Sequence, residues 1–369
     1  MSIALNKSER LISLDVMRGL IMILLAGESA TVYSSINNLS LPLWLHNVNQ
    51  QFFHHPWHGL HFWDLVQPAF MTMAGTAMYI SYIQKLKKGI TWKHNLKHIV
   101  IRSIKLFLLG TGLHCVYAGK LVFELWNVLT QLAVTTLIAY LFIRSSYTVQ
   151  IIIGVLLIVI NDLAYQLIQI PSFNYPFVEG KNLGSFIDLK LMGKINTDGW
   201  VAINCISTAA HTIWGVTIGK WLLTNNSNYS KLMRMFVFAL IALTIGYIAD
   251  YFGFSLIIKR IATGAFVLVS FGWVLIIMTL LYWWIDIRNH HRYVWIITSV
   301  GMNAIFIYLF FETVGYQWLR PTVYIFIGGF SSLLHMSNSV AYFINALVVW
   351  FIYWYLCFWL SKNRIFIKL

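Results

Sequence analysis

Apolar stretches about as long as a membrane-spanning helix recur along the whole chain, and short polar segments separate them. An α-helix crosses a bilayer core with ~20 consecutive apolar residues. We predict ten spans, at residues 13–35, 63–84, 99–118, 123–143, 148–168, 200–223, 233–250, 264–285, 294–312 and 338–360. The expected fold class is therefore all-α: a polytopic integral membrane bundle of about ten transmembrane helices, forming a single domain over residues 1–369.

The composition excludes a soluble globule. Of the 369 residues, 59% are hydrophobic and 10% are charged, and the mean hydropathy is +0.70. Typical soluble domains are about 25% charged, so this chain lacks the side chains that would cover a globule with polar surface. The net charge of +14 does not indicate a nucleic-acid partner, because the cations lie in short segments between apolar runs.

The distribution of Lys and Arg predicts the orientation. With the N-terminus in the cytoplasm, sixteen of the 26 cations fall in cytoplasmic segments and seven in outer segments, and the outer loop 36–62 has none. Membrane proteins fix their topology by this kind of asymmetry. An even number of spans returns the C-terminus to the cytoplasm. The long outer loops 36–62 and 169–199 are expected to carry a site, and the short segment 321–335 to be re-entrant or interfacial.

Carboxylates inside or at the edges of the predicted spans need an explanation. A charge at the bilayer centre costs at least ~2.5–3.5 kcal/mol, so such groups normally face a polar cavity or pair with a cation. Structural pairing at helix ends is the alternative, and it is favoured for Asp162 and Asp250. The carboxylates in question are Asp15, Glu28, Asp64, Glu124, Asp162, Asp250 and Glu312.

Two spans have basic inner ends. Asp15 and Arg18 are three residues apart at the start of the first span and would share one helix face; Arg102 and Lys105 repeat this spacing in the third span. An arginine at this depth can extend to lipid headgroups, or it can present its guanidinium to a phosphate that enters from the cytoplasm. We expect these four residues to bind an anionic cofactor.

The most specific signal is the block HHPWHGLHFWDLV at residues 54–66, in an outer loop without cations. Its four imidazoles precede Asp64, and imidazole is the side chain best suited to proton transfer near neutral pH. A carboxylate nearby can orient the ring, as in acid–base dyads. Structural histidines at the interface and a metal site remain alternatives, although Pro56 interrupts any helix with ligands at i and i+4, and there is no HExxH motif. We expect no metal.

These residues also carry a resemblance. The segment RLISLDVMRG at 10–19 and the block HHPWHGLHFWDLVQP at 54–68 resemble the opening motifs of the heparan-α-glucosaminide N-acetyltransferase family and its bacterial relatives. RSIKLFLLG at 102–110, NTDGW at 196–200 and GMNAIFIYL at 301–309 are similar to later parts of that family. The resemblance covers nearly the whole chain in order.

The resemblance implies a membrane acyltransferase that uses cytoplasmic acetyl-CoA to acetylate an amino sugar, such as glucosamine, or a glycan on the far side. It implies that His54 is the catalytic histidine and that Asp64 orients it. Further candidates for substrate contact or oxyanion stabilisation are Trp57, His58, Glu28 and Asn303. The expected location is a bacterial inner membrane with both termini cytoplasmic, and a homodimer stays open.

A proton-coupled small-molecule transporter is the rival function. Intramembrane carboxylates, a histidine cluster and the short interrupted segment 321–335 would all suit such a carrier. Against it, no pair of interrupted helices occupies matching positions in two halves of the chain. A structural membrane subunit would leave the block at 54–66 unexplained.

Overall fold

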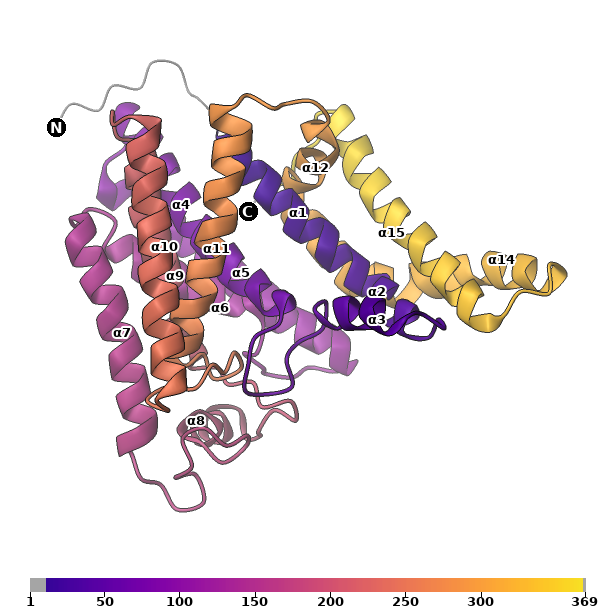
Figure 1. Ribbon diagram of the computed structural model, residues 1–369, viewed down its shortest axis with the longest axis horizontal. Helices are drawn as coiled ribbons and strands as arrows, with labels where there is room; N and C mark the ends of the chain where they lie inside the picture. The colour runs from indigo at the N-terminus through magenta and orange to yellow at the C-terminus, as the bar shows by residue number, and fades with distance from the viewer. Residues whose placement is uncertain (1–10, 368–369) are drawn as a thin grey trace. The chain divides into compact units, whose positions relative to one another are not determined.

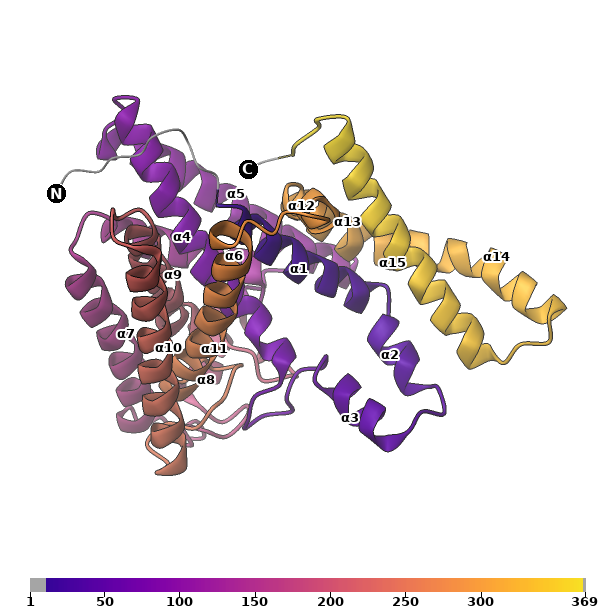
Figure 2. The same ribbon diagram turned by 45° about the horizontal axis from the view of Figure 1, so that its top comes forward.

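The computed structural model describes residues 11–367, and over these residues the secondary structure is helical, without a β-strand (Figures 1 and 2). The first half contains α1 (Ile12–Ser29), α2 (Val32–Asn37), α3 (Leu43–Gln50), η1 (Phe62–Leu65), α4 (Val66–Lys87), α5 (Trp92–Ala118), α6 (Val128–Leu141), α7 (Tyr147–Leu167) and α8 (Leu183–Met192). The second half contains α9 (Asn204–Leu222), α10 (Asn228–Tyr251), α11 (Gly264–Leu281), η2 (Tyr282–Ile287), α12 (Val294–Gly301), α13 (Ala304–Phe310), η3 (Phe311–Leu319), α14 (Arg320–Leu333) and α15 (Asn338–Lys362).

The described chain divides into two compact units, and each draws on separate parts of the sequence. Unit 1 comprises residues 55–60 and 64–280. Unit 2 comprises residues 11–54, 61–63 and 281–367. The chain therefore passes from unit 2 into unit 1 and back within the histidine block itself.

Helix α9 is the central helix of unit 1 and packs against α4, α6 and α7. Nearly all of its side chains are buried, including the polar Thr208, His211 and Thr217. Its crossing with α4 is close because glycine lies on both helices: a Cβ on Gly75 would overlap the carbonyl of Thr212, and one on Gly215 would overlap the carbonyl of Thr72. Small residues allow this backbone approach in membrane helix pairs.

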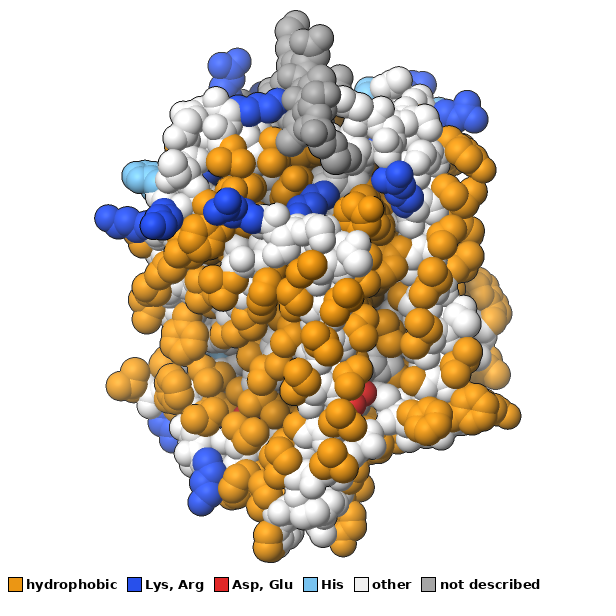
Figure 3. Space-filling view, turned by 90° about the vertical axis from the view of Figure 1, so that its left-hand side faces the viewer, with side chains coloured by type: hydrophobic (Ala, Val, Ile, Leu, Met, Phe, Trp, Pro, Cys, Tyr) orange, Lys and Arg blue, Asp and Glu red, His pale blue; other side chains and the backbone are white. Residues whose placement is uncertain are grey.

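The outer helices of unit 1 turn apolar side chains away from the protein. Exposed Leu, Ile, Val and Phe side chains run along α7 and α10. In Figure 3 hydrophobic side chains cover the middle of this face, and Lys and Arg gather toward its two ends. A band of this kind matches a lipid-facing surface bounded by two polar interfaces.

Unit 2 is built around α1, which packs against α12, α13 and α15. Gly19 and Gly301 allow the closest approach, since a Cβ on either would overlap the backbone of the facing helix. The N-terminus of α1 has no capping side chain of its own. Asp286 supplies one, because its carboxylate oxygens accept hydrogen bonds from the backbone N–H groups of Ile12 (3.0 Å) and Ser13 (3.2 Å).

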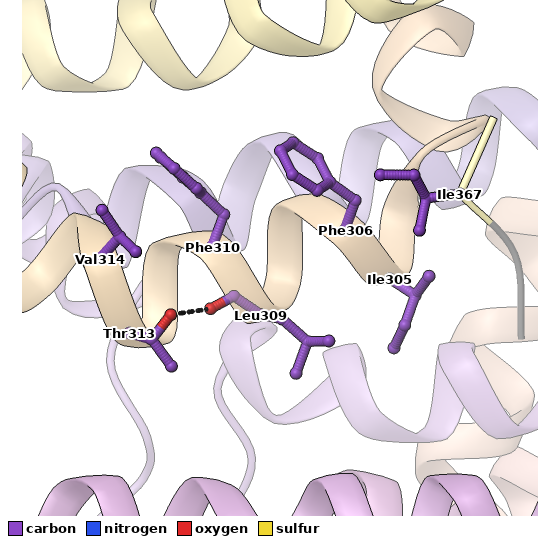
Figure 4. A pocket seen from close by; sticks show the side chains of 7 residues that line it. All are labelled: Ile305, Phe306, Leu309, Phe310, Thr313, Val314 and Ile367. Atoms are coloured by element: carbon purple, nitrogen blue, oxygen red, sulfur yellow. Dashed lines mark hydrogen bonds between the residues drawn. The ribbon is translucent and has the colours of Figure 1, made fainter. Parts of the chain in front are cut away.

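A break of helix geometry follows α12 in unit 2. Helix α12 and the continuous helical run 304–333 form a pair bent by 70°. Alongside this run lies an apolar cavity of about 230 Å³. Its lining residues, seen in Figure 4, are Ile305, Phe306, Leu309, Phe310, Thr313, Val314 and Ile367. Thr313 has the one polar side chain among these lining residues, and its hydroxyl donates to the carbonyl of Leu309 (2.7 Å) in the same helical run.

The fold is an all-α polytopic membrane protein, and each of the ten predicted ranges contains helix. Within residues 11–367, five helices qualify as spans by length and hydropathy, or six when the bent pair is counted as one. The number ten therefore stays a prediction. The predicted span 294–312 is not one continuous helix, because Met302 and Asn303 separate α12 from α13. Helix α14 occupies most of the segment 321–335.

Candidate active site

The histidine block forms an irregular loop that is fastened to the segment between α10 and α11. The backbone N–H of Gly59 donates to the carbonyl of Ile257 (2.9 Å), and His58 and Ile258 form an isolated antiparallel bridge. Gly59 has a φ of +137°, and a Cβ there would lie 2.6 Å from Nε2 of His55. Only glycine accommodates both the backbone conformation and the imidazole that covers it.

Asp64 is the most deeply buried acidic group of this loop region, with 1% of its side chain exposed. One carboxylate oxygen accepts from the backbone N–H of His55 (3.2 Å), and the other lies 3.4 Å from the ammonium of Lys259. Lys259 is itself buried, and its ammonium stands 5.4 Å from the ring centre of Trp200. A buried carboxylate is tolerable here because a cation and a backbone amide compensate it.

A second carboxylate holds His58. The Nε2 atom of His58 is 2.7 Å from Oδ1 of Asp250, and the same oxygen accepts from the backbone N–H of Ile257 (2.7 Å). Asp250 thus fixes both the imidazole and the segment that follows α10. Asp162, in contrast, accepts from the backbone N–H of Gly264 (2.9 and 3.0 Å) and caps α11.

The ring of Trp57 packs into the loop 169–199, which the charge distribution predicts to lie on the outer side. Its indole N–H donates to the carbonyl of Phe177 (2.7 Å), and a Cβ on Gly199 would lie 2.6 Å from the ring. Beside it, Glu179 and Arg260 form an ion pair at 3.5 Å. The indole N–H is therefore used within the protein, and a substrate could contact only the ring.

The sequence profile described as heparan-α-glucosaminide N-acetyltransferase, catalytic, matches residues 10–245, which is more than half of the chain. The chain belongs to this family. A search of the curated proteins finds no match. Membership of the heparan-α-glucosaminide N-acetyltransferase family implies acyltransferase activity and an integral membrane location.

The matched residues include the histidine loop and Asp64 but end within α10. Asp250, Lys259, Arg260 and Asn303 lie beyond them. The contacts that hold the loop in place are thus made partly by residues outside the stretch that identifies the heparan-α-glucosaminide N-acetyltransferase family.

The predicted catalytic pair falls in two different units. His54 is exposed and belongs to unit 2, whereas Asp64 belongs to unit 1. Their pairing stays a prediction. His61, also in unit 2, lies with Nδ1 3.0 Å from the carbonyl of Phe53, which favours a structural role for this ring.

The residues predicted to bind the family's anionic donor are likewise distributed over both units. In unit 2, Asp15 is buried at the start of α1 and lies 3.4 Å from Arg18. In unit 1, Arg102 and Lys105 are exposed on α5. Asp15 can orient the guanidinium of Arg18. The charged ends of Arg102 and Lys105 are accessible to solvent.

Two further candidates lie in unit 2. Glu28 is exposed near the end of α1. Asn303 is buried at the break after α12; its amide donates to the carbonyl of Ile365 (3.1 Å) and accepts from the N–H of Ile367 (3.0 Å). These bonds tie the C-terminal segment to the helix break, and an oxyanion role for Asn303 stays a prediction.

Sequence reasoning missed a polar cluster at the C-terminal end of α5. Nδ1 of His114 is 2.8 Å from Glu124, which also pairs with Lys194. Nearby, the indole N–H of Trp126 donates to Asp188 (2.6 Å), whose other oxygen accepts from the N–H of Ala202 (3.0 Å).

Burial raises the pKa of Asp188 to about 6, against the lowering effect of these two hydrogen bonds. Trp126 and Asp188 are 62 residues apart and Glu124 and Lys194 are 70 apart, so no local spacing indicates these two contacts. Among residues 11–367, no three His, Cys, Asp or Glu side chains converge as metal ligands would.

Proposed function

We propose that this chain is a transmembrane acetyltransferase that takes an acetyl group from cytoplasmic acetyl-CoA and transfers it to an amino sugar or glycan on the outer side. The observation that carries the proposal is the match of the catalytic profile across the histidine loop and Asp64. The fastening of this loop by Gly59, His58 and Asp64 supports it, because a catalytic imidazole needs a fixed backbone.

In the proposed reaction the acceptor amine attacks the thioester carbonyl of acetyl-CoA, and His54 accepts the proton that the amine releases. The tetrahedral intermediate then collapses, the C–S bond breaks, and the coenzyme A thiolate leaves and takes up a proton. General-base catalysis of this kind is worth about 10²–10⁴-fold. An acetyl-histidine intermediate at His54 is the two-step variant of the same chemistry.

We assign the binding roles by charge. Arg18, Arg102 and Lys105 would contact the phosphates of coenzyme A, and Asp15 would orient Arg18, which lies 3.4 Å away. On the outer side, the ring of Trp57 and the exposed imidazole of His58 would contact the acceptor. Glu28 and Asn303 remain candidates for polar contacts to the acceptor or the oxyanion.

The decisive experiment is acyl transfer by the purified protein. Radiolabelled acetyl-CoA is supplied with glucosamine, with N-acetylglucosamine and with glucose, and label in the sugar is followed. We expect label in glucosamine and none in glucose, since only the amine is nucleophilic enough at neutral pH. Label in N-acetylglucosamine would indicate hydroxyl transfer instead.

Absence of label in every sugar and in longer glycans would contradict the enzyme. The rival would then be tested directly: a proton-coupled carrier should accumulate the sugar in proteoliposomes when a pH gradient is imposed, without acetyl-CoA. An acetyltransferase should show no such uptake.

A further inference from the structure

Lys259 and Asp64 form a buried ion pair in unit 1. The side chains are 8% and 1% exposed, and the ammonium and the carboxylate are 3.4 Å apart. Removing one member of such a pair leaves the other as an uncompensated buried charge. Each member of the pair therefore favours the ionised form of the other. Lys259 therefore stabilises Asp64 in its ionised form.

The two oxygens of Asp64 have different partners. Oδ1 faces Lys259, and Oδ2 accepts from the backbone N–H of His55, in the peptide group that follows His54. An ionised carboxylate makes the stronger hydrogen bond to that amide. The charge on Lys259 thus acts on the loop backbone next to His54 through Asp64.

The segment that carries Lys259 is held rigidly. Ile258, its neighbour, is fully buried and donates its N–H to the hydroxyl of Thr263 (3.1 Å). The carbonyl of Lys259 accepts from the N–H of Ala262 (3.0 Å). Together with the Gly59–Ile257 hydrogen bond, these contacts fix where the ammonium can stand. This segment lies outside residues 10–245, so the family match does not account for it.

We propose that Lys259 is a positioning residue of the acyl-transfer site: it holds Asp64 as a carboxylate and thereby fixes the loop that carries His54. The inference rests on the proposed function and extends it to a residue beyond the family profile. Lys259 has no contact with the reacting atoms in this scheme and acts through Asp64.

The test uses the full-length protein and its acyl-transfer rate. Lys259→Ala should lower kcat by about 10–100-fold, the range typical of groups that orient a functional side chain from behind. The KM for acetyl-CoA should stay within about twofold. Added butylammonium should raise the kcat of Lys259→Ala several-fold, because it returns the positive charge to the space that the lysine side chain occupied. Butanol fills the same volume without a charge and should not raise it. Lys190→Ala is the matched control, since Lys190 is exposed on the outer helix α8; its kcat should equal that of the parent.

A parental kcat in Lys259→Ala, or equal rescue by butanol and butylammonium, would overturn the inference. If Lys259→Ala does not fold, the double variant Asp64→Asn/Lys259→Met carries the test, because it leaves no unpaired buried charge. The double variant should fold and have a low kcat that butylammonium does not raise. A kcat equal to that of the parent in the double variant would overturn the inference. Inactivity of the parent protein would instead count against the proposed function, so the two failures are distinguishable.

Discussion

At the scale of single residues, the imidazoles of the histidine block differ in their surroundings. His58 is paired with Asp250, His61 faces the carbonyl of Phe53, and the ring of His55 covers Gly59. Each of these three contacts shapes the loop or its attachment. His54 is exposed and occupies the position that the family resemblance assigns to catalysis.

His54→Ala should therefore lower acyl transfer by about 10²–10⁴-fold, since it removes the proton acceptor, while coenzyme A still binds. Transfer of label measures the rate, and equilibrium binding of coenzyme A checks the fold. His61→Ala is the matched control and should retain more activity. Loss of activity in His61→Ala together with full activity in His54→Ala would remove His54 from the site.

Arg18→Ala and Arg102→Ala should each weaken the binding of coenzyme A. The loss of a charged hydrogen bond to phosphate costs about 1.5–3 kcal/mol, which corresponds to a Kd raised by roughly 10–150-fold. Lys181→Ala, in the loop predicted to lie on the outer side, should bind coenzyme A as the parent does. Unchanged affinity in both arginine variants would show that the phosphates lie elsewhere.

The raised pKa of Asp188 predicts that the stability of the protein depends on pH. Its pKa rises from 3.8 to about 6 on folding because the carboxyl is buried, so the folded state holds a proton that the unfolded chain has released between these values. This stabilisation is complete below the unfolded value and is lost as the pH rises through about 6. The difference in melting temperature, parent minus Asp188→Asn, should thus decrease as the pH is raised from about 4 to about 7. Asp198→Asn, at an exposed position, should show no such trend. A pH-independent difference for Asp188→Asn would refute the burial argument.

At the scale of elements, hydropathy predicted where helices lie but not where they break. Long apolar runs locate a helix because the bilayer requires one, yet the same runs do not record a local change of backbone direction. Thr31, with a φ of +66°, separates α1 from α2, and Met302 and Asn303 separate α12 from α13. Both breaks depend on packing within unit 2, which a linear pattern does not contain.

The crossing of α4 and α9 should be intolerant of added volume. Gly75→Ala places a methyl group against the carbonyl of Thr212, and overpacking of this kind costs about 1–3 kcal/mol. The melting temperature in detergent should fall. Gly112→Ala on α5 is the matched control, because a Cβ there meets nothing within 4 Å. It should leave stability unchanged or slightly raised, since alanine favours helix. Equal melting temperatures for the two variants would mean that the crossing is not close.

At the scale of the whole molecule, the charge asymmetry predicts the topology. Reporters fused after Gly89 and after Leu369 should read cytoplasmic, and one inserted in loop 36–62 should read external. The reason is that the segments on the side of the N-terminus carry most of the cations, whereas loop 36–62 carries none. Glycosylation or protease-protection mapping measures this. A cytoplasmic loop 36–62 would be incompatible with transfer across the membrane.

The candidate site was predictable only in part. The block at 54–66 was found because histidine, glycine and aspartate stand close together in the sequence. Lys259 was counted merely as an outer cation, although it is the ionic partner of Asp64. The two are almost two hundred residues apart, and only the folded chain brings them within 3.4 Å. Ion pairs between residues so far apart in the sequence produce no spacing pattern from which they could be predicted.

The cap that Asp286 places on α1 has a consequence for biosynthesis. The residue that completes the first helix is 274 positions further along the chain than Ile12. At about 5–20 residues per second, the ribosome needs roughly 14–55 s to deliver it. During that interval the first amides of α1 must be satisfied by water or lipid headgroups at the membrane surface. Helix α1 therefore leaves the ribosome long before the carboxylate that caps it has been synthesised.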